Sequence, residues 1–148
     1  MTLINKTFLP IINSKNQNWF IIDCKEQKLG RLSTLIVNLL RGKIKSYYFS
    51  SINNKNYIIL INANLIKINK KNKYYFVNKP GKPGHSLKIK KFIDCKIEYI
   101  ILQSIKGMLS SVEKKNFIKK LKIYTNEIHL HKSQLPIKYQ KIKNDLKL

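Results

Sequence analysis

The chain has 148 residues, of which 43% are hydrophobic and 10% aromatic, so it can bury a core and is not a wholly disordered basic tail. It carries 30 lysine and arginine residues against 7 acidic ones, and the formal net charge of +23 favours either nucleic acid or an anionic membrane surface as partner. No apolar run reaches the roughly 18 residues of a membrane span. The first residues fit neither a secretory signal nor an arginine-rich transit peptide, so we expect the protein to work where it is made.

The predicted elements begin after an N-terminal arm, residues 1–18. Residues 19–22 form an apolar run that predicts a strand. Apolar residues then recur with helical spacing over residues 32–40, and Gly42 supplies a C-terminal stop. Residues 57–61 are continuously apolar, which is typical of a strand covered on both faces. Strand, helix and strand in this order predict a βαβ unit in a parallel sheet.

Next along the chain, residues 65–68 and 74–77 predict a hairpin around a basic turn, residues 69–73. Residues 79–85 follow as a loop, because their proline and glycine residues cannot join a regular element. The loop contains two lysines, and its glycines allow the backbone to approach an irregular RNA surface. Its Gly-Lys-Pro-Gly sequence also matches the GxxG of a KH domain, but no helix-turn-helix flanks it and the match is weak.

Helical spacing returns at residues 97–108, a second basic helix is predicted at residues 113–120, and a short strand follows at residues 121–124. The lysine-rich residues 137–148 are interpreted as a tail that orders on a partner. The sequence thus predicts one three-layer α/β/α domain, residues 19–136, with a mostly parallel central sheet and basic extensions.

Three segments interleave lysine with tyrosine: residues 43–48, 70–75 and 119–124. Lysine amines neutralise phosphates, while tyrosine rings stack on unpaired bases or hydrogen-bond a ribose hydroxyl. Any single tyrosine is more often a half-buried edge of the core. The lysines as a set need a counter-charge, so they are interpreted as an RNA-binding surface.

His129 and His131 stand two residues apart, so their side chains share one side of an extended segment and metal binding has to be considered. A tetrahedral site needs further ligands, for which His85, the cysteines and scattered carboxylates are the candidates. Contact with phosphate or a base edge, or hydrogen bonds that fix a loop, is the favoured interpretation. Cys24 and Cys95 are isolated and are interpreted as reduced thiols.

Catalysis finds little support in the sequence. The acidic residues fall singly, and there is no Walker loop, dinucleotide-binding glycine motif or nucleophile elbow. The sequence therefore predicts no enzyme, no cofactor, no metal and no small-molecule substrate.

Several short segments stand in a recognisable order. They are WFIIDC at 19–24, LGRLS at 29–33, LRGK at 40–43, INA at 61–63, KYY at 73–75, GKPG at 81–84, IKGML at 105–109, KLKIY at 120–124 and HLH at 129–131, followed by Gln134 and Pro136. Together they resemble the family of ribosomal large-subunit protein thirteen in its bacterial and plastid form, from residue 19 to residue 136. Each segment alone is weak, but the ordered set is a specific match.

The resemblance implies an α/β fold that helps large-subunit ribosomal RNA to fold during assembly and touches neighbouring ribosomal proteins, with no role at a membrane. The RNA-facing residues that it implies are Arg31, Arg41, Lys43, Lys73, Lys106, Lys122, His129, His131 and Gln134. Charge and aromatic pattern add Lys45, Lys71, Tyr74, Tyr75, Lys79, Lys82, Lys119 and Lys120. The implied location is the ribosome of a plastid, with a bacterial cytoplasm as the alternative.

The chain departs from the family pattern in three places. Residues 53–56 replace an Asp-Thr-Gly-Asp turn, Gly84-His85 replaces a glycine pair, and residues 110–115 replace a segment with Pro and a Gly-Arg step. Two other classes of function remain open from the residues alone. One is an RNA-processing or metal enzyme using His129 and His131, and the other is a nucleic-acid or membrane-surface binder acting outside the ribosome.

Overall fold

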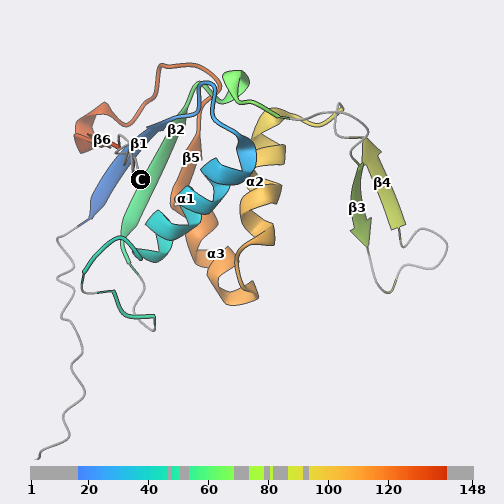
Figure 1. Ribbon diagram of the computed structural model, residues 1–148, viewed down its shortest axis with the longest axis horizontal. Helices are drawn as coiled ribbons and strands as arrows, with labels where there is room; N and C mark the ends of the chain where they lie inside the picture. The colour runs from blue at the N-terminus through green and yellow to red at the C-terminus, as the bar shows by residue number, and fades with distance from the viewer. Residues whose placement is uncertain are drawn as a thin grey trace, which may run out of the picture.

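The computed structural model describes residues 17–46, 48–50, 54–68, 74–78, 81, 87–91 and 94–139. The body of the molecule contains a four-stranded sheet in the order β5-β2-β1-β6, and every neighbouring pair of its strands is parallel (Figure 1). Its elements are β1 (Asn18–Asp23), α1 (Leu29–Arg41), β2 (Asn56–Ile61), η1 (Ala63–Leu65), α2 (Ile97–Gly107), α3 (Ser111–Lys119), β5 (Leu121–Ile123), η2 (Lys132–Gln134) and β6 (Ile137–Lys138). The predicted α/β class and parallel sheet are confirmed.

The predicted βαβ unit is β1, α1 and β2. Its helix buries an apolar stripe that includes Leu32, Ile36 and Leu40, as the spacing of these residues predicts. The helix ends at Gly42, which adopts the left-handed conformation with φ of 78° and donates its backbone N–H to the last turn. Strand β2 follows and pairs with β1 over the whole length of both strands.

All three α-helices pack on one face of the sheet, as their shared hydrophobic cluster shows. Because side chains alternate between the faces of a strand, Ile58 and Leu60 of β2 point into this cluster, where Ile101 of α2 and Phe117 of α3 also lie. The helices α1 and α2 touch directly. Among the described residues the helical layer is therefore single, where the sequence analysis expects two.

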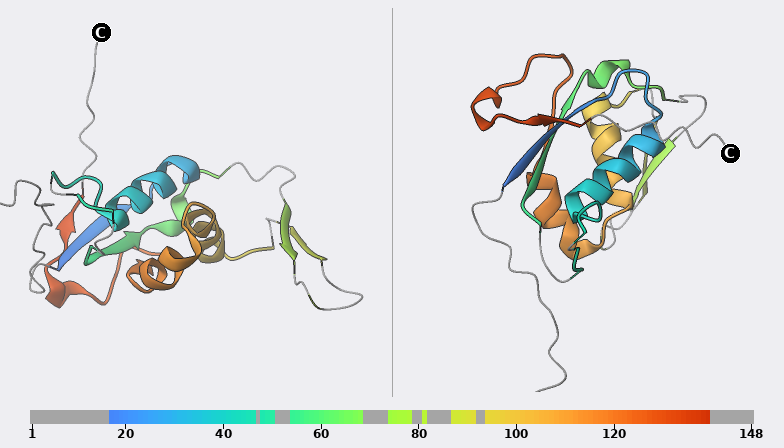
Figure 2. Two further views of the ribbon diagram at one scale, coloured as in Figure 1. Left: turned by 90° about the horizontal axis from the view of Figure 1, so that it is seen from below. Right: turned by 60° about the vertical axis from the view of Figure 1, so that its left-hand side comes forward.

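The other face of the sheet carries Trp19 and Tyr57 and is crossed by residues 124–136, which include η2 (Figure 2). This connection runs from β5 at one edge to β6 at the other, across a width of about 14 Å. An extended chain covers more than twice the distance per residue that an α-helix covers. A largely irregular connection therefore takes the place of the expected second helical layer.

The predicted hairpin is wrong in its pairing. β3 (Tyr74–Asn78) pairs antiparallel with β4 (Leu87–Lys91), and the two strands stand apart from the body (Figure 1). The predicted first strand, residues 65–68, instead stays on the body, where Ile66 is buried and Lys67 bridges to Lys28. Of the predicted loop, the structure describes Gly81 alone, with φ of 84°.

The sheet extends past residue 136. Ile137 and Lys138 form β6 beside β1, and the backbone N–H of Tyr139 donates to the carbonyl of Ile21 at 2.8 Å. These residues belong to the sheet rather than to the predicted tail. Residues 1–16 and 140–148 lie outside the described part, so the division into arm, domain and tail otherwise stays a prediction.

Candidate nucleic-acid interface

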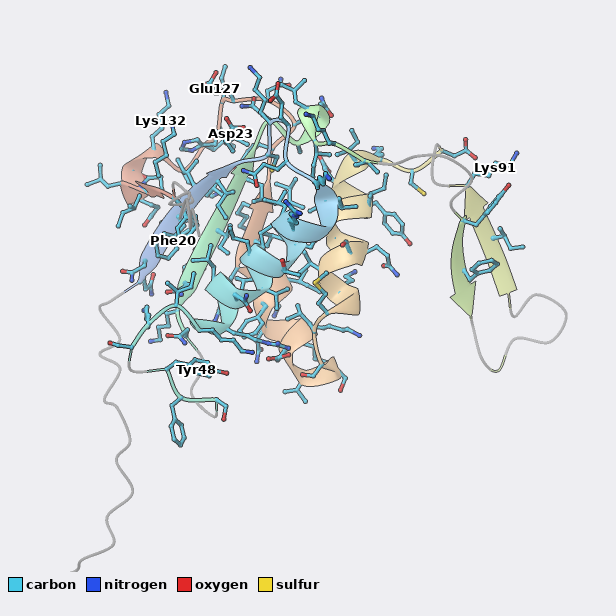
Figure 3. All side chains as sticks on the ribbon, in the orientation of Figure 1. Phe20, Asp23, Tyr48, Lys91, Glu127 and Lys132 are labelled. Carbon is cyan, nitrogen blue, oxygen red and sulfur yellow. The ribbon has the colours of Figure 1, made fainter. Side chains whose placement is uncertain are left out.

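The predicted RNA-binding residues fall on separate elements of the body. Arg31 is exposed in the first turn of α1, Lys43 follows its end, Lys119 ends α3, and Lys122 lies in β5. Lys106 is half-buried in the last turn of α2. Charged side chains reach both ends of the molecule, with Lys91 on the hairpin and Lys132 on η2 far apart in Figure 3. The basic charge is therefore displayed over the surface rather than gathered in one cleft.

Arg41 is paired within the protein. Its Nε donates to Oε1 of Glu113 at 2.9 Å and its Nη2 to Oε2 at 2.8 Å, while Nη2 also reaches the carbonyl of Met108 at 3.2 Å. The hydrogen bonds from Arg41, followed by those from Ser110, lower the pKa of Glu113 from 4.5 to about 2. The same carboxylate completes a capping box with Ser110. Arg41 thus ties the end of α1 to the start of α3.

Lys120 is also held internally. Its Nζ donates to the carbonyl of Asn54 at 2.6 Å and lies 5.3 Å from the centre of the Phe117 ring. Burial lowers its pKa, and the charge of Lys55 adds to that effect. The site prediction for Arg41 and Lys120 stays a prediction, but both side chains have a structural role that the sequence did not indicate.

The two histidines join an aromatic cluster over the far face of the sheet. The rings of Trp19 and Tyr57 stack with centres 4.5 Å apart and an interplanar angle of 11°. The His131 ring lies 5.2 Å from Trp19 and 6.1 Å from Tyr124, and the His129 ring lies 6.3 Å from Tyr124. His131 therefore packs residues 124–136 against Trp19 of the sheet, whereas the ring contact of His129 is with Tyr124 in the same segment. The RNA contact or loop-fixing hydrogen bonds predicted for the two histidines stay a prediction.

The β3–β4 hairpin presents an exposed aromatic face. Tyr74 and Phe76 are two residues apart, and their partners across the ladder are Lys91 and Ile89, so all four share one face. Phe76 is 63% exposed. Phe76 was not among the residues predicted from the sequence, although its two-residue spacing from Tyr74 was the available signal. Four predicted lysines lie outside the described residues, as does the side chain of Tyr75: Lys71, Lys73, Lys79 and Lys82.

A second exposed apolar surface lies around η2, near Gln134, which is itself exposed. Leu130 and Leu135 are each 85% exposed, and Ile128 and Ile137 lie beside them in the chain with most of their surface open. Leu135 has φ of 45°, a left-handed conformation that is uncommon for a side chain of this size. Large exposed apolar side chains in one segment favour a protein contact.

The surface cavities of the described part include the following two. One, of about 400 Å³, is lined by Tyr57, Asn116, Lys119 and Lys120. The other, of about 640 Å³, is lined by Ile89 and Lys91 of β4 and by residues around the start of α2, namely Asp94, Cys95, Lys96 and Tyr99. The first brings together two of the lysines that the sequence analysis selected.

Within the described residues, no three histidine, cysteine or acidic side chains come close enough to hold a metal ion. In the same described residues, no helix is long and apolar enough to cross a membrane. Cys24 is buried, which raises the pKa of its thiol to about 12, and the neighbouring charge of Asp23 adds to the rise.

These features define a class: a small, strongly basic α/β protein whose core and internal ion pair hold a rigid body under a cationic surface. The comparison with known families agrees, because residues 17–130 match the family described as Ribosomal protein L13. The chain belongs to this family, and the resemblance read from its sequence is confirmed.

Curated relatives match over nearly their whole length. "Large ribosomal subunit protein uL13c" of Trieres chinensis is 39% identical over 136 residues, which are 91% of this chain and 96% of that protein. The protein of the same name from Gracilaria tenuistipitata var. liui is 42% identical over 143 residues, 90% and 96% of the two chains. "Large ribosomal subunit protein uL13" of Prochlorococcus marinus subsp. pastoris is 36% identical over 141 residues, 90% and 97% of the two.

Proposed function

We propose that this chain is a non-enzymatic structural component of the large ribosomal subunit, where it binds ribosomal RNA and supports its folding during assembly. The observation that carries the proposal is the family match over residues 17–130. The net charge of +23 supports it, since this charge costs free energy in a compact protein unless a polyanion neutralises it.

The proposed mechanism is replacement of counter-ions by lysine and arginine side chains held at fixed positions. Arg31, Lys43, Lys119 and Lys122 are exposed on the folded body and are available to phosphates. Helices and strands fix the spacing of these charges, so an RNA fold that places phosphates at the matching positions is stabilised over others. The predicted lysines outside the described residues remain part of the proposed surface.

Neighbouring large-subunit proteins are the second proposed partner. The surface around η2 supports this part, because Leu130 and Leu135 expose their side chains almost completely. Burying them on another protein gains roughly 1.5–3 kcal/mol each. The proposed location is the ribosome of a plastid, with a bacterial ribosome as the alternative, since the relatives include proteins named uL13c and uL13.

The RNA part is tested by measuring affinity for a large-subunit ribosomal RNA transcript at several salt concentrations. We expect log affinity to fall linearly with log salt, with a slope of about −0.7 to −0.9 for each phosphate neutralised. Lys122→Gln should reduce the magnitude of that slope by about 0.7 to 0.9, the contribution of one phosphate contact. Lys25→Gln is the matched control, because Lys25 is exposed but has Asp23 and Glu26 beside it in the chain. A flat salt response would contradict the proposal.

The ribosomal part is tested by sucrose-gradient sedimentation of cell or organelle extracts. A structural component should sediment with large subunits and remain there after a moderate salt wash. A protein found only in the light fractions would contradict the assignment, whatever its affinity for RNA.

A further inference from the structure

One face of the Tyr57 ring is already used in a stack. The ring of Trp19 on β1 covers it at 4.5 Å, close to the spacing of neighbouring strands. Because β2 lies between β1 and β5, the opposite face of the Tyr57 ring is directed toward β5. A further ring placed on that side would continue the stack.

A cavity lies on that same side. Its volume is about 400 Å³, and its lining combines the Tyr57 ring with the amide of Asn116 and the amines of Lys119 and Lys120. Trp19 is not among the described lining residues, as expected if the cavity borders the face of the Tyr57 ring that Trp19 does not cover. The lining supplies an aromatic surface, an amide that can donate and accept, and two cations, with no acid among its described residues.

This combination fits one ligand chemistry in particular. An inorganic anion would use the Lys119 amine but not the ring, and an apolar side chain would use the ring but leave the Lys119 amine without a counter-charge. A nucleotide uses all of them, because its base has a π-face, its edges have hydrogen-bond donors and acceptors, and its phosphate is anionic. The volume lies within the usual range for small-ligand cavities.

We propose that this cavity receives one unpaired nucleotide, whose base continues the Trp19–Tyr57 stack and whose phosphate is held by Lys119. Asn116 is placed to hydrogen-bond the base edge. Lys120 acts chiefly by holding the wall of the cavity, since its amine is bonded to the carbonyl of Asn54. The inference rests on the proposed function and deepens it, because it names a base-stacking site on a protein that otherwise binds phosphates.

The test uses the full chain and a short single-stranded RNA that carries 2-aminopurine, a base whose fluorescence falls when it stacks. We expect quenching on binding, and tighter binding than that of a duplex of equal length. Tyr57→Leu should abolish the quenching and weaken single-strand binding by about 5- to 100-fold. Tyr139→Leu is the matched control, because Tyr139 packs edge-on against Phe20 in the core on the helix-covered face.

Lys119→Gln is the second variant and removes the phosphate contact at an exposed position. It should weaken single-strand binding and lower the salt slope by about 0.7, while the 2-aminopurine of the bound RNA remains quenched. A free adenine mononucleotide should compete only at much higher concentration, because it lacks the flanking phosphates. Circular dichroism of each variant checks that the fold is kept.

The outcomes separate this inference from the function on which it rests. If Tyr57→Leu quenches 2-aminopurine as the parent chain does, the cavity is not a base site. If the parent chain binds duplex and single strand equally without quenching, the inference is likewise wrong, although ribosomal RNA binding stands. If the parent chain binds no RNA at low salt, the proposed function itself fails.

Discussion

Two buried asparagine side chains close the carboxyl end of α1. Asn56 donates to the carbonyl of Leu39 and Asn54 to the carbonyl of Arg41, each at 2.7 Å. Carbonyls in the last turn have no partner within the helix, and a buried one left alone costs about 1–3 kcal/mol. Gly42 lies against Asn54, and this close contact leaves no room for a Cβ. Asn54 and Asn56 thus cap the carboxyl end of the helix.

Gly42→Ala should lower the free energy of unfolding by about 1–3 kcal/mol, because alanine is strained at positive φ and its Cβ collides with the Asn54 amide. Gly30→Ala is the matched control within the same helix. No atom lies within 4 Å of its added Cβ. That change should raise the free energy of unfolding by about 0.5–1 kcal/mol. Urea denaturation measures both, and equal effects would contradict this account of the cap.

The two thiols should differ in reactivity. Cys24 is buried and its pKa is about 12, so little thiolate forms near neutral pH, whereas Cys95 is half-buried. With excess maleimide at pH 8, we expect mass spectrometry to show rapid modification of Cys95 and modification of Cys24 only as the protein unfolds. Equal rates in the folded chain would show that Cys24 is accessible.

At the scale of elements, side-chain pairs fix the helices to one another. Ser33 of α1 and Ser104 of α2 share a hydrogen bond of 2.9 Å, and Arg41 and Glu113 join α1 to α3. The Arg41–Glu113 pair is bidentate and partly exposed, so its contribution is modest, about 1 kcal/mol. Together with the Ser33–Ser104 bond, the pair holds the three helices as one layer against the sheet.

The pH dependence follows from the lowered pKa of Glu113. A carboxyl group with a lowered folded pKa contributes stability above its unfolded value of 4.5, and this contribution is lost as the pH falls toward about 2. Glu113→Gln should therefore lower the free energy of unfolding at pH 6 and reduce the loss seen between pH 4.5 and 2. Glu127→Gln, at an exposed position, is the control, and denaturation curves across this range measure both. An unchanged acid profile in Glu113→Gln would contradict a role for the ion pair.

At the scale of the whole molecule, a compact body carries a large excess of one charge. Burial of the core offsets the electrostatic repulsion between these charges, and counter-ions or a polyanion in the surroundings reduce that repulsion. The same surface that binds RNA therefore limits the stability of the free protein. RNA binding and the stability of the free protein therefore both depend on the repulsion between these basic side chains.

The melting temperature should accordingly rise by several degrees between 20 and 300 mM salt as the charges are screened. Ribosomal RNA should raise it further at low salt by binding the folded state, and this increment should shrink at high salt. Differential scanning fluorimetry with an uncharged polymer as control measures the effect. A melting temperature that falls with salt would show that attractive pairs outweigh repulsion.

Elements with strong local patterns, the basic character and the family could be predicted from the sequence alone. Strands were predicted at residues 19–22 and 57–61, and the structure places them at Asn18–Asp23 and Asn56–Ile61. The helix that ends before Gly42 was predicted as well, because period and stop signals are encoded in neighbouring residues. The order of the family motifs is likewise a property of the linear sequence and does not depend on the fold.

The pairing of segments and the partner of each cation could not be predicted from the sequence, because both depend on the folded arrangement. Two nearby segments, residues 65–68 and Leu87–Lys91, could have paired with Tyr74–Asn78. Ile66 is buried on the body, and Leu87–Lys91 is the segment that pairs. In the sequence, Arg41 and Lys120 cannot be told apart from an RNA-binding cation such as Lys119. In the folded chain, Arg41 binds the carboxylate of Glu113 and Lys120 binds the carbonyl of Asn54. Local pattern fixes a residue's secondary structure, whereas the partner of its side chain depends on residues far along the chain that folding brings near.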